Sequence, residues 1–138
     1  MKYYLAYGSN LNKRQMARRC PDAVPVGVIS IMGYELVFRT FATIEPKDGA
    51  EVQCGIWKIS PEDEKRLDLY EGYPSLYVKQ DFWVTVDGKT VRAMAYVMLD
   101  GVRPVSPPAT EYLLTIVEGY EDFGLDDKPL SIAATRRD

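Results

Sequence analysis

Two short segments that lie far apart in the chain contain the residue types that could carry chemistry. Tyr7-Gly8-Ser9-Asn10 follows a short apolar run, and Glu71 ends a helix-like segment just before Gly72. Glycine lets a backbone approach a ligand closely, and successive N–H groups leading into a helix bind anions or a developing oxyanion. A carboxylate at a helix exit is a candidate general base. Together the two segments predict an electrostatic cradle and a base.

Glu71 is expected to have a raised pKa. Carbonyl dipoles at a helix C-terminus disfavour an anion, and the neighbouring Tyr70, Tyr73 and Tyr77 would remove water from it. A carboxylate shifted upward in this way suits proton transfer near neutral pH. Each motif also has a plain alternative when taken alone. Glu71 could simply face solvent at a helix end, and the glycine segment could be an ordinary strand-to-helix turn.

Other polar side chains near these segments are weaker candidates. Tyr77 and Tyr96 fall on the two arms of an expected hairpin, where each could offer a hydroxyl to a substrate or fill the core. Asp68 lies three residues before Glu71 on the same helix face, and is expected to act through a neighbour at most. Packing is the default expectation for four further tyrosines: Tyr3, Tyr4, Tyr112 and Tyr120.

Composition narrows the chemistry further. The chain has 138 residues, a net charge of −3 and no histidine, which excludes histidine bases, serine–histidine triads and ordinary zinc sites. A single domain over residues 1–138 is expected. The basic pairs Lys13-Arg14 and Arg18-Arg19 are interpreted as one solvated helix face, so no nucleic-acid partner is expected. Cys20 and Cys54 are expected to be reduced buried thiols.

The chain contains no stretch that resembles a targeting signal. The first apolar run, Tyr3–Tyr7, is too short for a signal sequence, and no run has the length needed to span a membrane. A cytoplasmic protein without a membrane partner is therefore expected. The oligomeric state cannot be read from the sequence.

Hydrophobic periodicity and turn residues predict the elements that must position these groups. Ser60-Pro61 starts a helix that ends near Glu71-Gly72, and Asp87-Gly88 joins the two arms of a hairpin. The residues 41–49 are expected to be a loop. Strands are expected over residues 2–7, 26–39, 52–59, 77–86 and 91–99, and helices over residues 10–19, 60–71, in the segment after Pro108 as far as Gly124, and after Asp127.

The long strand expected over residues 26–39 indicates how the sheet is curved. Val26, Val28, Met32, Leu36 and Phe38 are expected to share one face, and interior glycines on the other face suit a strongly curved sheet. The order of strands and helices predicts an α+β fold, a small mixed barrel-like sheet with flanking helices.

These features, in this order, resemble the γ-glutamyl cyclotransferase-like family over nearly the whole chain. Each motif is short, but the ordered set is specific. The matching segments are Tyr7-Gly8-Ser9-Asn10-Leu11, Gly33-Tyr34-Glu35-Leu36-Val37-Phe38, Gly55-Ile56-Trp57, Leu67-Asp68 through Glu71-Gly72, Tyr77, Ala95-Tyr96-Val97, and Gly119-Tyr120 to Gly124-Leu125.

The resemblance implies a reaction: release of 5-oxoproline from a γ-glutamyl compound by attack of the substrate's own α-amine. It implies Glu71 as the catalytic acid and base, Tyr7 to Leu11 as the loop that binds the γ-glutamyl part, and Tyr77 and Tyr96 as residues lining the site. No metal or organic cofactor is required. The segment Gly72-Tyr73-Pro74 favours the γ-glutamylamine type of substrate. The alternative is a non-catalytic module that binds a small molecule or a protein partner on the same fold.

Overall fold

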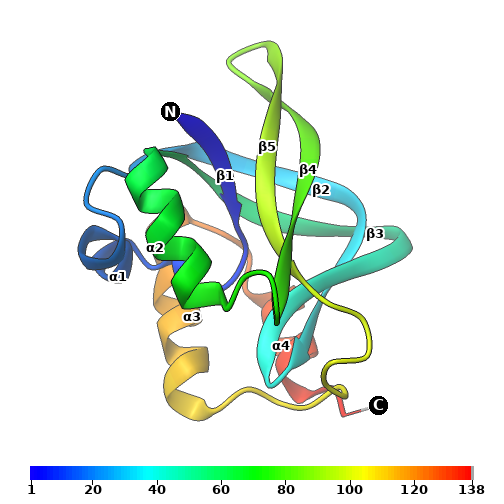
Figure 1. Cartoon of the computed structure of the whole chain (residues 1–138). Coiled ribbons are helices and arrows are strands. Elements are labelled where there is room, and N and C mark those ends of the chain that lie inside the picture. Colours follow the sequence, from blue (N-terminus) through cyan, green and yellow to red (C-terminus); the bar gives the residue numbers. More distant parts are fainter. Residues whose placement is uncertain (138) are drawn as a thin grey trace.

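The fold was described from a computed structural model, in which residues 1–137 are described. These residues form five strands and five helical segments, in the order β1-η1-α1-β2-β3-α2-β4-β5-α3-α4 (Figure 1). The strands are β1 (Lys2–Ala6), β2 (Val24–Arg39), β3 (Phe41–Ile59), β4 (Tyr77–Val86) and β5 (Lys89–Met98). The helical segments are the 3₁₀ turn η1 (Ser9–Leu11) and the helices α1 (Lys13–Arg19), α2 (Pro61–Glu71), α3 (Thr110–Phe123) and α4 (Lys128–Thr135).

The five strands form one mixed sheet in the order β2-β3-β1-β5-β4. The short β1 is central, antiparallel to β3 and parallel to β5. Within residues 1–137 no ladder joins β2 to β4, so the sheet is open. Its two edge strands nevertheless touch, because the Gln80 amide donates to the Tyr34 hydroxyl at 2.8 Å and the Tyr34 and Phe82 rings pack edge to face. The expectation of an α+β fold with a curled mixed sheet is confirmed.

The expectation that alternate residues of 26–39 share one face is wrong. Two register irregularities interrupt β2, one between Pro25 and Gly27 and one between Met32 and Tyr34. Each bulge changes the alternation of side chains. As a result Met32 faces solvent while Ile31 is buried, and beyond the second bulge Leu36 and Phe38 are buried instead.

The expected loop over residues 41–49 is instead the first half of the long strand β3. The chain reverses at Thr40, which has a positive φ of 68°, and Arg39 pairs directly with Phe41. The polar residues that suggested a loop lie at the second bulge of the hairpin. There, Gly33 on β2 stands opposite four residues of β3, Lys47–Ala50, which have no partner in the ladder.

The helical segments flank the sheet. In Figure 1, α1, α2 and α3 gather on one side of the sheet, and α4 lies beside the β2–β3 hairpin. A continuous cluster of buried apolar side chains joins them to the sheet, and its largest fully buried members include Phe38, Leu5, Met16, Ile116 and Leu130. This packing brings α2, η1 and the start of β3 to one place.

Two structural expectations about α2 and the β4–β5 hairpin are confirmed. Ser60 accepts from the Asp63 N–H at 3.1 Å and Asp63 in turn accepts from the Ser60 N–H, which forms a capping box. Gly72 ends the helix in the left-handed conformation. The hairpin turns at Asp87-Gly88, and both residues have a positive φ.

Candidate functional site

Hydrogen bonds fix the conformation of the loop that follows β1. The Leu11 N–H donates to the Gly8 carbonyl and the Asn12 N–H to the Ser9 carbonyl, both at 3.0 Å. This makes one 3₁₀ turn in which the first N–H groups, from Gly8 to Asn10, have no partner within the turn. The Trp57 indole N–H donates to the Asn10 carbonyl at 3.1 Å. These N–H groups are therefore held in a fixed turn at the end of the central strand β1.

Leu11 anchors this loop in a slot made by two glycines. Its side chain is fully buried between Gly55 on β3 and Gly119 on α3. A Cβ added at Gly55 would lie 2.9 Å from the Leu11 Cδ2, and one added at Gly119 would lie 2.6 Å from the Leu11 Cβ. Leu11 was predicted to bind substrate, but the structure places it under the loop, where it fixes the loop's position.

The register of α2 directs Glu71 inward. Asp63 and Leu67 are both fully buried, and Glu71 follows at the same four-residue spacing on the same face of the helix. The chain leaves the helix at Gly72, so Glu71 is the last side chain of α2. The capping residues of α2 thus determine where its final carboxylate lies.

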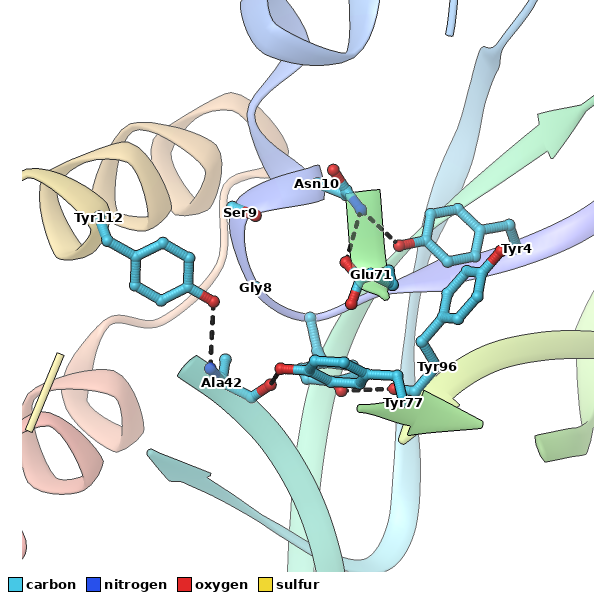
Figure 2. Close-up of a pocket in the computed structure, with 10 residues that line it drawn as sticks. Tyr4, Gly8, Ser9, Asn10, Ala42, Glu71, Tyr77, Tyr96 and Tyr112 are labelled. Carbon is cyan, nitrogen blue, oxygen red and sulfur yellow. Dashed lines mark hydrogen bonds between the residues drawn. The ribbon is translucent and has the colours of Figure 1, made fainter. Parts of the chain in front are cut away.

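A small cavity lies between these elements. Figure 2 shows the Glu71 carboxylate pointing into it, with Asn10 on one side and the Tyr77 ring on the other. The ten lining residues come from residues 4–10 and from five further elements, β3, α2, β4, β5 and α3: Tyr4, Tyr7, Gly8, Ser9, Asn10, Ala42, Glu71, Tyr77, Tyr96 and Tyr112. The two motifs that are far apart in the sequence therefore face one another across a single cavity.

Burial governs the charge state of Glu71. It raises the pKa of Glu71 from 4.5 to about 7, and the Arg19 guanidinium offsets part of that rise. The upward direction is the one predicted from the sequence. The Asn10 amide lies 3.5 Å from the Glu71 Oε1 and donates to it, and the same amide donates to the Tyr4 hydroxyl at 2.9 Å. Near neutral pH this carboxyl is therefore present in both its protonated and ionised forms.

Arg19 connects the two motifs. Its guanidinium lies over the Tyr70 ring, 3.5 Å from the centroid, and donates to the Asn10 side-chain oxygen. The Tyr70 hydroxyl in turn hydrogen-bonds the Ser9 Oγ at 2.8 Å. The interpretation of Arg18-Arg19 as a solvated face is therefore wrong for Arg19, which packs inward, and holds for Arg18, which is exposed.

Three tyrosine hydroxyls at the cavity bind the protein's own backbone. The Tyr77 hydroxyl donates to the Ala42 carbonyl at 2.5 Å, and the Tyr112 hydroxyl accepts from the Ala42 N–H at 3.1 Å. The Tyr7 hydroxyl donates to the Tyr96 carbonyl at 2.5 Å. These rings form walls whose hydroxyls fix β3 and β5 in place.

Tyr96 and Asp68 form a separate pair behind the cavity. The Tyr96 hydroxyl donates to the Asp68 carboxylate at 2.6 Å, and the Lys79 ammonium lies 3.0 Å from the same carboxylate. The Tyr96 ring lines the cavity while its hydroxyl points away from it. Asp68 therefore positions Tyr96 and balances Lys79, in keeping with the indirect role expected from the sequence.

Four lining or supporting residues were missed by sequence reasoning. Tyr4 and Tyr112 were expected only to pack, yet both line the cavity, and Ala42 and Arg19 were not among the predicted site residues. Alternation along β1 could have pointed to Tyr4, which is two residues from Ala6 on the same face. No local signal identifies Ala42 or Tyr112, since they reach the cavity from β3 and α3.

The remaining predictions concern metals, membranes and thiols. Within residues 1–137 no group of three or more acidic or cysteine side chains is arranged to hold a metal ion. In the same range, every helix is too short or too polar to cross a bilayer. Cys20 and Cys54 are both free and buried, as expected, and burial raises the pKa of the Cys20 thiol to about 12.

Comparison with known proteins gives a consistent family. Residues 4–114 match the family described as gamma-glutamyl cyclotransferase, AIG2-like. Gamma-glutamylcyclotransferase from Mus musculus is 31% identical over 136 residues, which cover 88% of this chain and 71% of that protein. The Homo sapiens protein of the same name is 30% identical over the same shares.

A solved structure agrees with the sequence matches. A protein named gamma-glutamyl cyclotransferase superposes with a TM-score of 0.83 at 26% identity, covering 99% of this chain and 89% of that one. The resemblance seen in the ordered motifs and the prediction of an enzyme of this kind are thereby confirmed at the level of the family. The chain belongs to the gamma-glutamyl cyclotransferase, AIG2-like family.

Proposed function

We propose that this chain releases 5-oxoproline and a free amine or amino acid from a γ-glutamyl compound, with Glu71 as acid and base. The observation that carries the proposal is the position of Glu71, a carboxyl with a pKa of about 7 in a cavity edged by the Gly8–Asn10 loop. The names of its relatives, which share family membership and fold with this chain, support the same reaction class.

In the proposed first step, ionised Glu71 accepts a proton from the substrate's α-ammonium. The neutral amine then attacks the γ-carbonyl carbon and forms the ring C–N bond. Because nucleophile and carbonyl belong to one molecule, holding them in the reactive geometry can contribute on the order of 7–11 kcal/mol. The tyrosine walls of the cavity are suited to holding an extended γ-glutamyl chain in that folded form.

In the second step, the γ-carbonyl oxygen becomes an oxyanion. We place it against the N–H groups of the Gly8–Asn10 turn, which have no partner within the turn. One such donor typically contributes about 3 kcal/mol to lowering the barrier. The tetrahedral intermediate collapses as the original amide C–N bond breaks, and protonated Glu71 donates its proton to the departing nitrogen. The ionised carboxylate then takes the second proton from the ring nitrogen and passes it to the released amine, which leaves as an ammonium. At the end of the cycle Glu71 is ionised again, as it was at the start.

The competing function is a non-catalytic module that binds a small molecule. A binding site has no need of a carboxyl that is half ionised near neutral pH, and burial of Glu71 beside only one opposing cation favours catalysis. The two functions differ in one measurable result, which is the appearance of 5-oxoproline.

The test is an assay of the purified protein for 5-oxoproline. The panel should contain γ-glutamyl dipeptides and the γ-glutamylamine Nε-γ-glutamyl-lysine, since Gly72-Tyr73-Pro74 favoured the amine type. Glu71→Gln should retain the fold and reduce the rate by about 10²–10⁴-fold. The exposed Glu62 lies on the same helix, so Glu62→Gln is a matched control that should keep full activity. Undiminished turnover by Glu71→Gln would refute the assigned role.

A further inference from the structure

A second, larger cavity adjoins the one that contains the Glu71 carboxylate. It is lined by Ser9, Phe41, Tyr70, Glu71, Leu76, Tyr77 and Tyr112. Four of these residues, Ser9, Glu71, Tyr77 and Tyr112, also line the first cavity. The two cavities therefore meet at the candidate base, and a ligand bound there could extend into both.

The residues that belong to the second cavity alone are apolar or aromatic. They are Phe41 at the start of β3, Tyr70 on α2, and Leu76 in the loop between α2 and β4. The first cavity, by contrast, adds the Gly8–Asn10 loop and the Asn10 amide to the shared residues. The first cavity is thus polar and the second is apolar. Apart from two tyrosines, Glu71 is the one ionisable residue that lines both.

Contacts behind the apolar walls hold them in place. The Phe41 ring packs edge to face on Tyr112 with 5.5 Å between centroids, and Tyr70 is held by the Arg19 guanidinium over its ring. The Leu76 N–H donates to the Gly72 carbonyl at 2.9 Å, which fixes the chain just beyond the end of α2. The second cavity is therefore bounded by positioned side chains from three separate elements.

The corner that carries Phe41 is also fixed. The Thr40 N–H donates to the Ser106 carbonyl and the Ser106 N–H to the Phe38 carbonyl, both at 3.0 Å. These bonds hold the β2–β3 turn, with Thr40 at a positive φ, against the segment before α3. Apolar walls beside a few convergent polar groups are typical of a small-molecule binding site.

This inference rests on the proposed function. A γ-glutamyl group carries an ammonium and a carboxylate, which favour the polar cavity, and its scissile amide must lie at Glu71. We infer that the leaving group enters the second cavity, and that Phe41 and Leu76 select γ-glutamyl compounds whose leaving amine carries a bulky apolar or aromatic substituent. Polar or acidic substituents would lose their water there without gaining a partner.

The experiment compares leaving groups of matched shape. Wild-type protein is given γ-Glu-Leu, γ-Glu-Asn, γ-Glu-Phe, γ-Glu-Gly and γ-Glu-Glu, and 5-oxoproline, the common product, is measured for each. Leucine and asparagine side chains have similar shapes and differ in polarity. We expect kcat/KM for γ-Glu-Leu and γ-Glu-Phe to exceed that for γ-Glu-Asn, γ-Glu-Gly and γ-Glu-Glu by about tenfold or more.

Substitution of the cavity wall tests the same assignment from the protein side. Leu76→Asn should lower the γ-Glu-Leu to γ-Glu-Asn ratio of kcat/KM by about tenfold, because it changes polarity at nearly constant volume. Leu69, which is 85% exposed on α2, provides the control, and Leu69→Asn should leave this ratio unchanged. Phe41→Ala supplies a second variant, with its largest loss expected for γ-Glu-Phe.

The outcomes separate this inference from the function on which it rests. If 5-oxoproline forms but its rate is the same for apolar and polar leaving groups, the inference is wrong and the cyclotransferase proposal stands. The same holds if the ratio survives both wall variants. If no γ-glutamyl compound yields 5-oxoproline, the proposed function fails and the inference fails with it.

Discussion

The Asn10 side-chain amide lies 3.5 Å from the Glu71 carboxylate and donates to it, although 61 residues separate the two in the chain. Asn10 also donates to the Tyr4 hydroxyl and accepts from Arg19, so its orientation is fixed from two sides. Asn10 was expected to act mainly through its backbone. Its side chain in addition links the loop to the candidate base.

The activity is expected to depend on pH through Glu71. The base must be ionised to accept a proton, and its pKa is about 7. The logarithm of kcat/KM should therefore rise with a slope of one below pH 7 and level off above it. A pH profile with a γ-glutamyl dipeptide measures this. An acid limb centred near pH 4.5, the ordinary value for glutamate, would contradict the burial of this group.

The stability of the fold should also depend on the charge state of Glu71. Activity requires the ionised form, whereas the fold is more stable when Glu71 is protonated. Its folded pKa is raised from 4.5 to about 7, so its favourable contribution is complete below pH 4.5 and is lost as the pH rises to 7. Glu71→Gln should remove that loss and stabilise the protein at pH 8 by up to about 3 kcal/mol. Urea unfolding of both proteins at pH 4 and pH 8 tests this. Equal differences at the two pH values would contradict it.

Arg19 is expected to adjust the pKa of the base. Its guanidinium lowers the pKa of Glu71, so Arg19→Gln should raise that pKa and move the acid limb of kcat/KM to higher pH. Arg18 is the matched control, because it carries the same charge but is exposed, and Arg18→Gln should leave the profile in place. A reduced plateau without any shift of the acid limb would mean that Arg19 acts only by orienting Asn10.

Ser9 is expected to contribute chiefly through its backbone. Its hydroxyl bonds Tyr70 at 2.8 Å, whereas its N–H is one of those proposed to meet the oxyanion. Ser9→Ala removes the hydrogen bond to Tyr70 and should lower kcat/KM by about tenfold at most, corresponding to about 1.4 kcal/mol. Side-by-side kinetics with Glu71→Gln provide the comparison. A loss as large as that of Glu71→Gln would mean that the hydroxyl itself takes part in the reaction.

The slot for Leu11 should be intolerant of any added side chain. A Cβ at residue 119 would lie 2.6 Å from the Leu11 Cβ and 2.8 Å from the Asn12 backbone nitrogen, so Gly119→Ala must displace the loop or α3. We expect a destabilisation of about 1–3 kcal/mol in urea unfolding, together with reduced activity. Gly27→Ala is the control, since its Cβ would meet nothing within 4 Å. Equal stability of the two variants would show that the slot can widen.

Local sequence was sufficient to predict α2 and the turn of the β4–β5 hairpin. Ser60, Pro61 and Gly72 define the ends of α2 through contacts within one or two turns, and Asp87-Gly88 supplies the positive φ values of a tight turn. These features depend on interactions between residues that are close in the chain.

The rest was decided by tertiary contacts. The residues Tyr4, Ala42 and Tyr112 reach the cavity from β1, β3 and α3. The sequence around each of them does not indicate that the three would meet. The bulges of β2 depend on its pairing with β3, so its alternation could not be followed across Gly33. Local sequence determines where elements start, stop and carry charge, whereas the cavity is formed by side chains whose proximity exists only after the sheet has assembled.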